Sequence, residues 1–257
     1  MTNISQAQSD FDGIELVSGV GTRANRELCV MSFVALMAGE RHTDRPATAC
    51  PVIASYVIKI NDAIDCDTRQ KLKPFAARIM GTNDGRRRER AWVLARECVN
   101  DVFARELEDA GAPGEVIAAL PRMPVSVNTS FDFKRLSDDL YALGRQYGID
   151  RNRLYDLRYM LRAMERGSDE LVASAAAVLI VDCARLDKGP ITKNTYWNKA
   201  IEMFARLCDV GEGNRVPVPV MEERLQADAN RDRMAEAYAP MLLWLFPGLR
   251  KPLKPAE

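Results

Sequence analysis

The sequence contains a single histidine, His42, among its 257 residues. A metal site built from several imidazoles is therefore excluded, and any histidine-dependent mechanism must use His42. Lys and Arg together number 36, as do Asp and Glu, so the formal net charge is zero. Binding to nucleic acid or to an anionic membrane would therefore depend on a local basic patch rather than on the charge of the whole chain.

Long apolar runs and paired cysteines are also lacking. No run approaches the roughly 18 apolar residues that a membrane span needs, so we expect no membrane association. The first 20 residues are polar and acidic, unlike a secretory signal. We therefore predict a cytoplasmic protein whose six cysteines stay reduced, and none of them forms a CxxC pair.

Strand signals are nearly absent, because β-branched residues show no sustained alternation. Apolar residues instead recur at helical spacing, and glycines fall between the resulting segments, as is typical of helix C-termini. We predict an all-α fold of about nine or ten helices, packed as two helical subdomains. The main helices are expected at 25–38, 51–64, 74–80, 86–110, 115–120, 132–147, 151–166, 168–186, 192–210 and 221–237.

A stretch rich in Pro, Ser, Asn and Thr after residue 120 is the best candidate boundary between the two halves. It predicts an N-terminal subdomain at 21–123 and a C-terminal subdomain at 130–249. Residues 1–20 are expected to form a flexible leader and residues 250–257 a flexible tail.

An apolar run lies near the C-terminus, at 240–247, and contains Trp244, Leu245 and Phe246. We expect this run to dock on the second subdomain, because an exposed apolar patch of this kind favours aggregation. The alternative is that these three residues form a homodimer contact.

The segment 28–53 has the strongest motif character. It carries Leu28-Cys29, Ala38-Gly39-Glu40, His42 with Asp44, and Pro51-Val52, and Asn61-Asp62 follow further on. The pattern resembles that of a family of uncharacterised bacterial and phage-encoded proteins, over roughly residues 20–110. The resemblance implies a phage or mobile-element setting and no particular activity.

Glu40, His42 and Asp44 alternate along a short loop between two predicted helices. In an extended loop they would point to the same side and offer one imidazole and two carboxylates. These groups suit a single metal ion or an acid/base pair. Cys50 is a candidate nucleophile beside His42, because a helix N-terminus lowers the pKa of a thiol. The alternative is that Asp44 is a turn residue, Glu40 is solvated and His42 hydrogen-bonds to the backbone of its own loop.

Arginines and tyrosines share one arc of the predicted helix 151–166. The arc holds Arg151, Tyr155, Arg158, Tyr159, Arg162 and Arg166. Guanidinium groups beside phenol rings can hold phosphates and stack on bases, and they can equally bind an acidic protein surface. The alternative is a solvated helix face on which arginine stems lie over tyrosine rings.

A second basic cluster, residues 86–88 with Arg90, stands at the start of a predicted helix, and we expect its side chains to extend into water. Further along the same helix Glu97 and Asp101 are four residues apart. We expect them to be surface acids that pair with Arg105.

The sequence carries no glycine-rich nucleotide loop, no GxSxG and no HExxH. We therefore interpret the protein as a helical interaction or regulatory protein that binds a macromolecular partner, foremost another protein, with no cofactor. Two alternatives stay open. One is a metal-dependent or acid/base enzyme at Glu40, His42 and Asp44, and the other is nucleic-acid binding through the Arg/Tyr arc.

Overall fold

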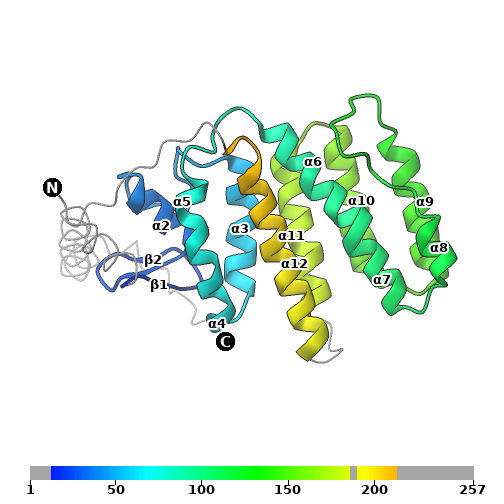
Figure 1. Ribbon diagram of the computed structural model, residues 1–257, viewed down its shortest axis with the longest axis horizontal. Coiled ribbons are helices and arrows are strands. Elements are labelled where there is room, and N and C mark those ends of the chain that lie inside the picture. The colour runs from blue at the N-terminus through cyan, green and yellow to red at the C-terminus, as the bar shows by residue number, and fades with distance from the viewer. Residues whose placement is uncertain (1–12, 186–189, 213–257) are drawn as a thin grey trace, which may run out of the picture.

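The computed structural model describes residues 13–185 and 190–212. Its described part is predominantly helical, which confirms the predicted fold class. Figure 1 shows helices lying side by side along the long axis, with a small sheet and α2 at one end and α8 and α9 at the other.

The described chain begins with a sheet of three very short strands. β1 (Glu15–Leu16) lies parallel to β3 (Glu27–Leu28), and β2 (Gly21–Thr22) pairs antiparallel with the other edge of β3. The sequence did not reveal this sheet, because two-residue strands are too short to show an alternating pattern.

The next two helices are largely buried. α2 (Val30–Met37) begins later than the predicted helix 25–38, because β3 takes up the first residues of that range. All eight of its residues are buried, as the even spread of apolar side chains around the helix predicts. α3 (Pro51–Ala63) matches the prediction and begins with a proline, whose missing N–H is not needed at the first helical position.

Short helical turns connect α3 to the next long helix. They are α4 (Cys66–Arg69), a 3₁₀ helix (Gln70–Phe75) and α5 (Ala76–Ile79). Pro74 lies within the 3₁₀ helix, where the sequence predicts a break.

A long helical rod then follows, as predicted for 86–110. It consists of α6 (Arg87–Glu97) and α7 (Phe103–Asp109), joined by a π-helical turn (Cys98–Val102). α8 (Gly114–Ala118) leads into the irregular stretch before the second half.

The described part of the second half contains four longer helices, and two of them have clear start and stop signals. The carboxylates of Asp132 and Asp150 accept hydrogen bonds from backbone N–H groups in the first turns of α9 and α10. Gly148 and Gly167 follow these two helices with φ values of 72° and 70°, a backbone conformation that favours glycine. The four helices are α9 (Phe133–Gln146), α10 (Arg151–Glu165), α11 (Asp169–Arg185) and α12 (Pro190–Asp209).

α11 lies at the centre of the described molecule (Figure 1). It packs between α3 and α10, and α12 and α6 pack against it as well. Helices of the second half therefore lie directly on helices of the first, and one hydrophobic core runs through both. The division into subdomains at 21–123 and 130–249 stays a prediction, and its two parts share this core.

Residues 13–20 fall within the predicted flexible leader, yet they form β1 and bury Ile14 and Leu16 in the core. The predicted helix 221–237, the apolar run 240–247 with Trp244, Leu245 and Phe246, and the tail 250–257 lie outside the described residues.

Candidate functional site

The loop after α2 uses its glutamate to close on itself. The two carboxylate oxygens of Glu40 accept hydrogen bonds from the backbone N–H groups of Ala47 and Thr48, at 2.6 and 2.9 Å. The backbone C=O of Glu40 accepts a further bond from Arg23 at 2.9 Å. This carboxylate is therefore not simply solvated but holds the loop together.

The histidine of this loop contacts the small sheet. His42 Nε2 lies 3.0 Å from the carbonyl oxygen of Gly21. Among the described residues, no group of three or more His, Cys, Asp or Glu side chains is arranged to hold a metal ion, so Glu40, His42 and Asp44 do not form a ligand set.

The candidate nucleophile Cys50 is fully buried at the start of α3. Its backbone N–H donates to Thr82 Oγ1 at 2.8 Å. A substrate cannot reach a fully buried thiol, so the described structure does not support a Cys–His dyad of Cys50 and His42.

The remaining motif residues also join elements of the scaffold. Asn61, which is fully buried, accepts from Val30 N at the start of α2 and donates to the Val17 carbonyl at 2.8 Å. The neighbouring Asp62 accepts from Gly19 N, also at 2.8 Å. The segment with the strongest motif character therefore positions the sheet, α2 and α3 relative to one another.

Arg90 corrects one expectation, because it is fully buried rather than extended into water. Its guanidinium donates to both carboxylate oxygens of Asp84, at 2.6 and 2.8 Å. It also donates to the carbonyl oxygens of Thr82, Leu207 and Val210. Arg90 thus joins the start of α6 to the loop before it and to the end of α12.

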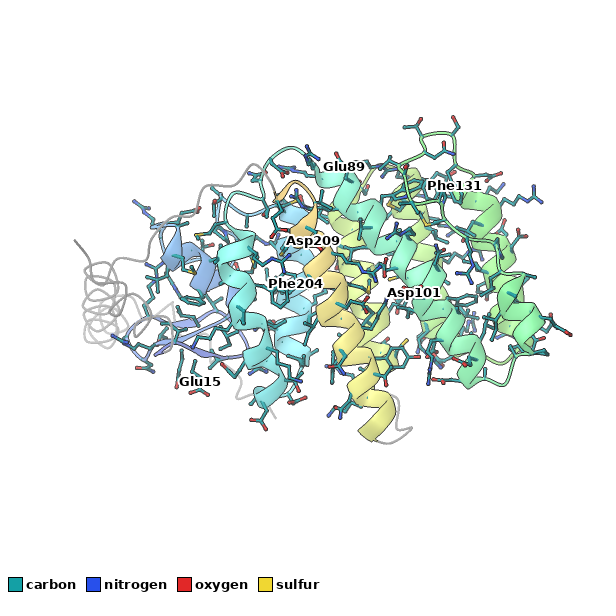
Figure 2. The ribbon with its side chains drawn as sticks, viewed as in Figure 1. Glu15, Glu89, Asp101, Phe131, Phe204 and Asp209 are labelled. Atoms are coloured by element: carbon teal, nitrogen blue, oxygen red, sulfur yellow. The ribbon has the colours of Figure 1, made fainter. Side chains whose placement is uncertain are left out.

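Glu97 corrects a second expectation, since it is buried between α6 and α12 rather than at the surface. Its carboxylate accepts from Lys199 and Arg96 at 2.9 Å and from Arg206 at 2.5 Å. Burial alone would raise the pKa of Glu97, but these donors lower it to about 2. Asp101, which is labelled in Figure 2, also pairs with Lys199, at 2.6 Å.

A third buried polar group lies where α7, α10 and α12 meet. Glu106 forms an ion pair with Arg153 and accepts a hydrogen bond of 2.5 Å from Tyr196 Oη. Burial raises the pKa of Tyr196, so its hydroxyl stays protonated and can donate. Arg153 lies on α10 but outside the predicted Arg/Tyr arc, and it holds the helix to the core.

The Arg/Tyr arc itself is at the surface. Tyr155 and Tyr159 are 63% and 41% exposed, and their rings stack with centroids 6.3 Å apart and planes 15° apart. Arg162 and Arg166 form no ion pair with any described residue. Arg158 differs, since it pairs with Asp138 of α9 at 2.8 Å.

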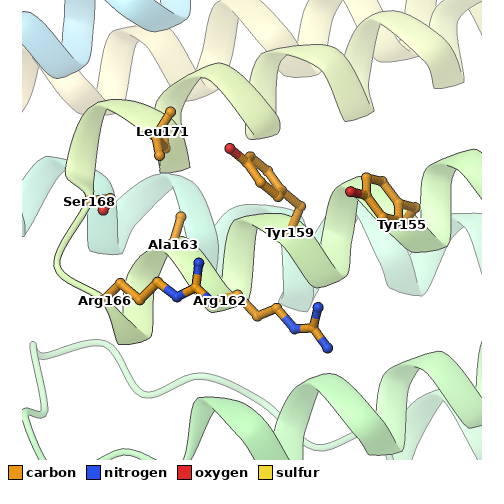
Figure 3. A pocket seen from close by; sticks show the side chains of 7 residues that line it. All are labelled: Tyr155, Tyr159, Arg162, Ala163, Arg166, Ser168 and Leu171. Carbon is orange, nitrogen blue, oxygen red and sulfur yellow. The ribbon is translucent and has the colours of Figure 1, made fainter.

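These side chains surround a hollow of about 270 Å³ between the end of α10 and the start of α11 (Figure 3). Leu171, in the first turn of α11, is 46% exposed and lines it. The hollow is lined by Tyr155, Tyr159, Arg162, Ala163, Arg166, Ser168 and Leu171.

Two further hollows continue along the outer side of α11, between it and α3. The nearer one, of about 300 Å³, shares Leu171 with the first and includes Arg45, Lys59 and Ser174. The farther one, of about 290 Å³, shares Lys59 and reaches Asp182 near the end of α11. We call this surface, from α3 across α11 to α10, the α11 face.

The α11 face was only partly foreseen. The Arg/Tyr arc marked its α10 border, but no sequence pattern places Leu171, Ser174 or Lys59 beside it. The apolar sequence of α11 predicts a helix that is buried on all sides. Only the tertiary structure shows that no other described helix covers its outer side.

Charge is distributed unevenly on this face. Arg162 and Arg166 lie at the end where α11 begins, and Asp156 and Asp182 lie toward the end where it finishes. Burial raises the pKa of Asp156, and the carboxylates of Asp182 and Asp150 raise it further, to about 6. The carboxylates of Asp182 and Asp150 therefore create a negative field at the Asp156 side chain.

No protein-family model, curated protein or solved structure matches this chain. The resemblance to bacterial and phage-encoded proteins stays a prediction. None of the helices in the described ranges combines the length and the apolar character needed to cross a membrane.

Proposed function

We propose that the protein acts as an interaction protein that binds another protein through the α11 face. The observation that carries the proposal is the gathering of Tyr155, Tyr159 and Leu171, all exposed, beside the unpaired Arg162 and Arg166. Tyrosine and arginine are enriched at protein interfaces and at the residues that dominate binding energy.

The composition of the face favours a protein over a nucleic acid. Arginine and tyrosine suit both partners, but Asp156, Glu170 and Asp182 lie on or beside the same surface and would repel phosphates. The zero net charge of the chain adds no long-range attraction. Mixed charges around apolar side chains are what a protein surface of complementary pattern recognises.

Site-specific photo-crosslinking in the cells that produce the protein tests the proposal. A photoreactive phenylalanine analogue replaces Leu171 in one variant. It replaces Val125 in a control, because Val125 is also an exposed apolar residue, 78% exposed, in the loop after α8. We expect a discrete protein adduct from position 171 that position 125 does not give. Adding R162E and R166E should remove this adduct.

Two results would contradict the proposal. Equal adducts from both positions would mean that the α11 face has no special affinity. An adduct at position 171 that disappears on nuclease treatment would identify a nucleic acid as the partner, in place of a protein.

A further inference from the structure

We infer that the partner of the α11 face is a second copy of this chain, packed antiparallel across α11. The inference rests on the proposed function and names the partner. It depends on three properties of the face: its charge pattern, its shape and its size.

The charge pattern is complementary to itself. A two-fold axis that crosses α11 at a right angle places each end of the face on the opposite end in the second copy. Arg162 and Arg166 then meet the partner's Asp156, which has Asp182 beside it. An axis parallel to α11 would instead place Arg166 near the partner's Arg45, and like charges in an interface are costly.

The shape of the face suits a close approach at the same place. Ser174 is a small residue on the outer side of α11, three residues after Leu171 and four before Val178. An axis at the level of Ser174 brings Leu171 over the partner's Val178. The exposed leucine is thereby covered by an apolar residue, and the two α11 helices meet where their side chains are short.

The area of the α11 face lies at the lower end of the range found for specific protein interfaces. From Leu171 to Arg185 the helix rises about 21 Å. Three neighbouring helices span about 28 Å in width, since axes are 8–10 Å apart and a helix is about 10 Å across. The resulting area, about 600 Å² per protomer, fits a reversible dimer rather than an obligate one.

Two groups of the remaining charges are balanced within one copy. Glu170 lies near Arg45, with 3.9 Å between the closest charged atoms, so the pair is nearly neutral. Lys59 and Arg185 line the farther hollow with Asp62 and Asp182, and that hollow carries no net charge. Asp182 is therefore balanced within its own hollow, and Asp156 of α10 is the acid that the antiparallel packing brings to the partner's arginines.

Sedimentation of the purified full chain over a range of concentrations tests the inference. We expect a reversible monomer–dimer equilibrium in the micromolar range. R162E with R166E should weaken the dimer at least about tenfold, because two glutamates then face the partner's acids. D156K with D182K should weaken it to a similar degree. An equimolar mixture of the two variants should form a heterodimer, since each set of reversed charges then meets its complement.

Matched controls keep the test interpretable. R122E with R145E changes the net charge equally at exposed positions off the α11 face and should leave the dimer intact. Asp156 is half-buried, so lysine at this position could disturb the fold, and circular dichroism would detect such a change. In that case D156N with D182N serves as a milder second variant. It should weaken the dimer less than the lysines do.

A full chain that stays monomeric at every concentration would overturn the inference. A dimer that neither charge-reversed pair weakens would do the same. If the purified chain is monomeric while position 171 crosslinks to a protein of another mass, the inference fails and the proposed function stands. If position 171 gives no adduct of its own in cells and the chain is monomeric, both fail.

Discussion

Replacing Arg90 with alanine should cost a large share of the stability of the fold. The fully buried guanidinium donates to both oxygens of Asp84 and to the backbone carbonyls of Thr82, Leu207 and Val210. Its removal leaves carbonyl oxygens in the core without donors, at about 1–3 kcal/mol each, although relaxation and water entry offset part of this. Breaking a buried ion pair costs about 3–5 kcal/mol, and we expect a loss in that range.

The same contact predicts how the loss depends on pH. Hydrogen bonds from Arg90 lower the pKa of Asp84 from 3.8 to about 2 in the folded protein. A carboxyl group with a lowered folded pKa stabilises the protein above its unfolded pKa, and this contribution is lost as pH falls through the folded pKa. A shift of this size corresponds to at most about 2 kcal/mol, and solvent screening at the partly exposed Asp84 lowers this figure. The difference between wild type and R90A should therefore shrink between about pH 4 and pH 2.

Urea denaturation followed by circular dichroism measures both effects. The control is R87A, because Arg87 lies one turn earlier on the same helix, is exposed and has no ion pair with any described residue. We expect R87A to change the free energy of unfolding by less than about 0.5 kcal/mol. A loss below about 1 kcal/mol for R90A, or a loss that stays constant down to pH 2, would refute this account of Arg90.

Three further changes have definite expected results in the same assay. Glu97→Gln should destabilise the fold by about 2–4 kcal/mol at pH 7, because Lys199 and Arg206 lose the buried carboxylate that they share. Lys199 then keeps only the more exposed carboxylates of Asp101 and Glu202. Asp156→Asn should stabilise dilute protein by about 1–2 kcal/mol at pH 8 and hardly at all at pH 4. A folded pKa of about 6 penalises the charged form, and that penalty disappears below the unfolded pKa. Gly144→Ala should destabilise by about 1–3 kcal/mol despite the better helix propensity of alanine, because its Cβ would lie 2.3 Å from Leu154 Cδ2.

Matched changes at the surface serve as controls for the two acidic residues. Glu108→Gln and Asp139→Asn alter exposed carboxylates whose ion pairs are 3.4 and 3.8 Å long, so each should shift stability by less than about 1 kcal/mol. A Glu97 variant that behaves like the Glu108 variant would show that the network around Glu97 is well solvated. An Asp156 variant with the same effect at pH 4 and pH 8 would rule out a raised pKa as the cause.

The sequence predicted the part of the candidate site that lies on α10, and it missed the parts that lie on α11 and α3. The Arg/Tyr arc could be found because helical periodicity places residues three, four and seven apart on one face. The same reasoning could not detect that Arg158 turns away to Asp138 of α9, or that Leu171 of the next helix completes the hollow. Those facts depend on which helices become neighbours, and no local pattern contains that information.

The loop at 40–46 shows the opposite case. Glu40, His42 and Asp44 share a spacing that suits a metal ion or an acid/base pair. In the structure, however, the Glu40 carboxylate accepts hydrogen bonds from two backbone N–H groups, and His42 Nε2 lies at hydrogen-bond distance from the Gly21 carbonyl oxygen. Loops must satisfy their own backbone groups when they are partly buried, and nearby polar side chains are the partners at hand. Spacing alone cannot distinguish such a partner from a ligand.

The sequence by itself determined the helical class, most helix positions and the side of α10 that reaches solvent. Those features follow from apolar periodicity, capping aspartates and glycines, which act within a few residues of one another. Only the tertiary structure decided that Arg90 and Glu97 are buried, and that α11 shows one open side between α3 and α10. A charged residue is buried only where partners from distant segments converge on it, and that convergence exists only once the chain has folded.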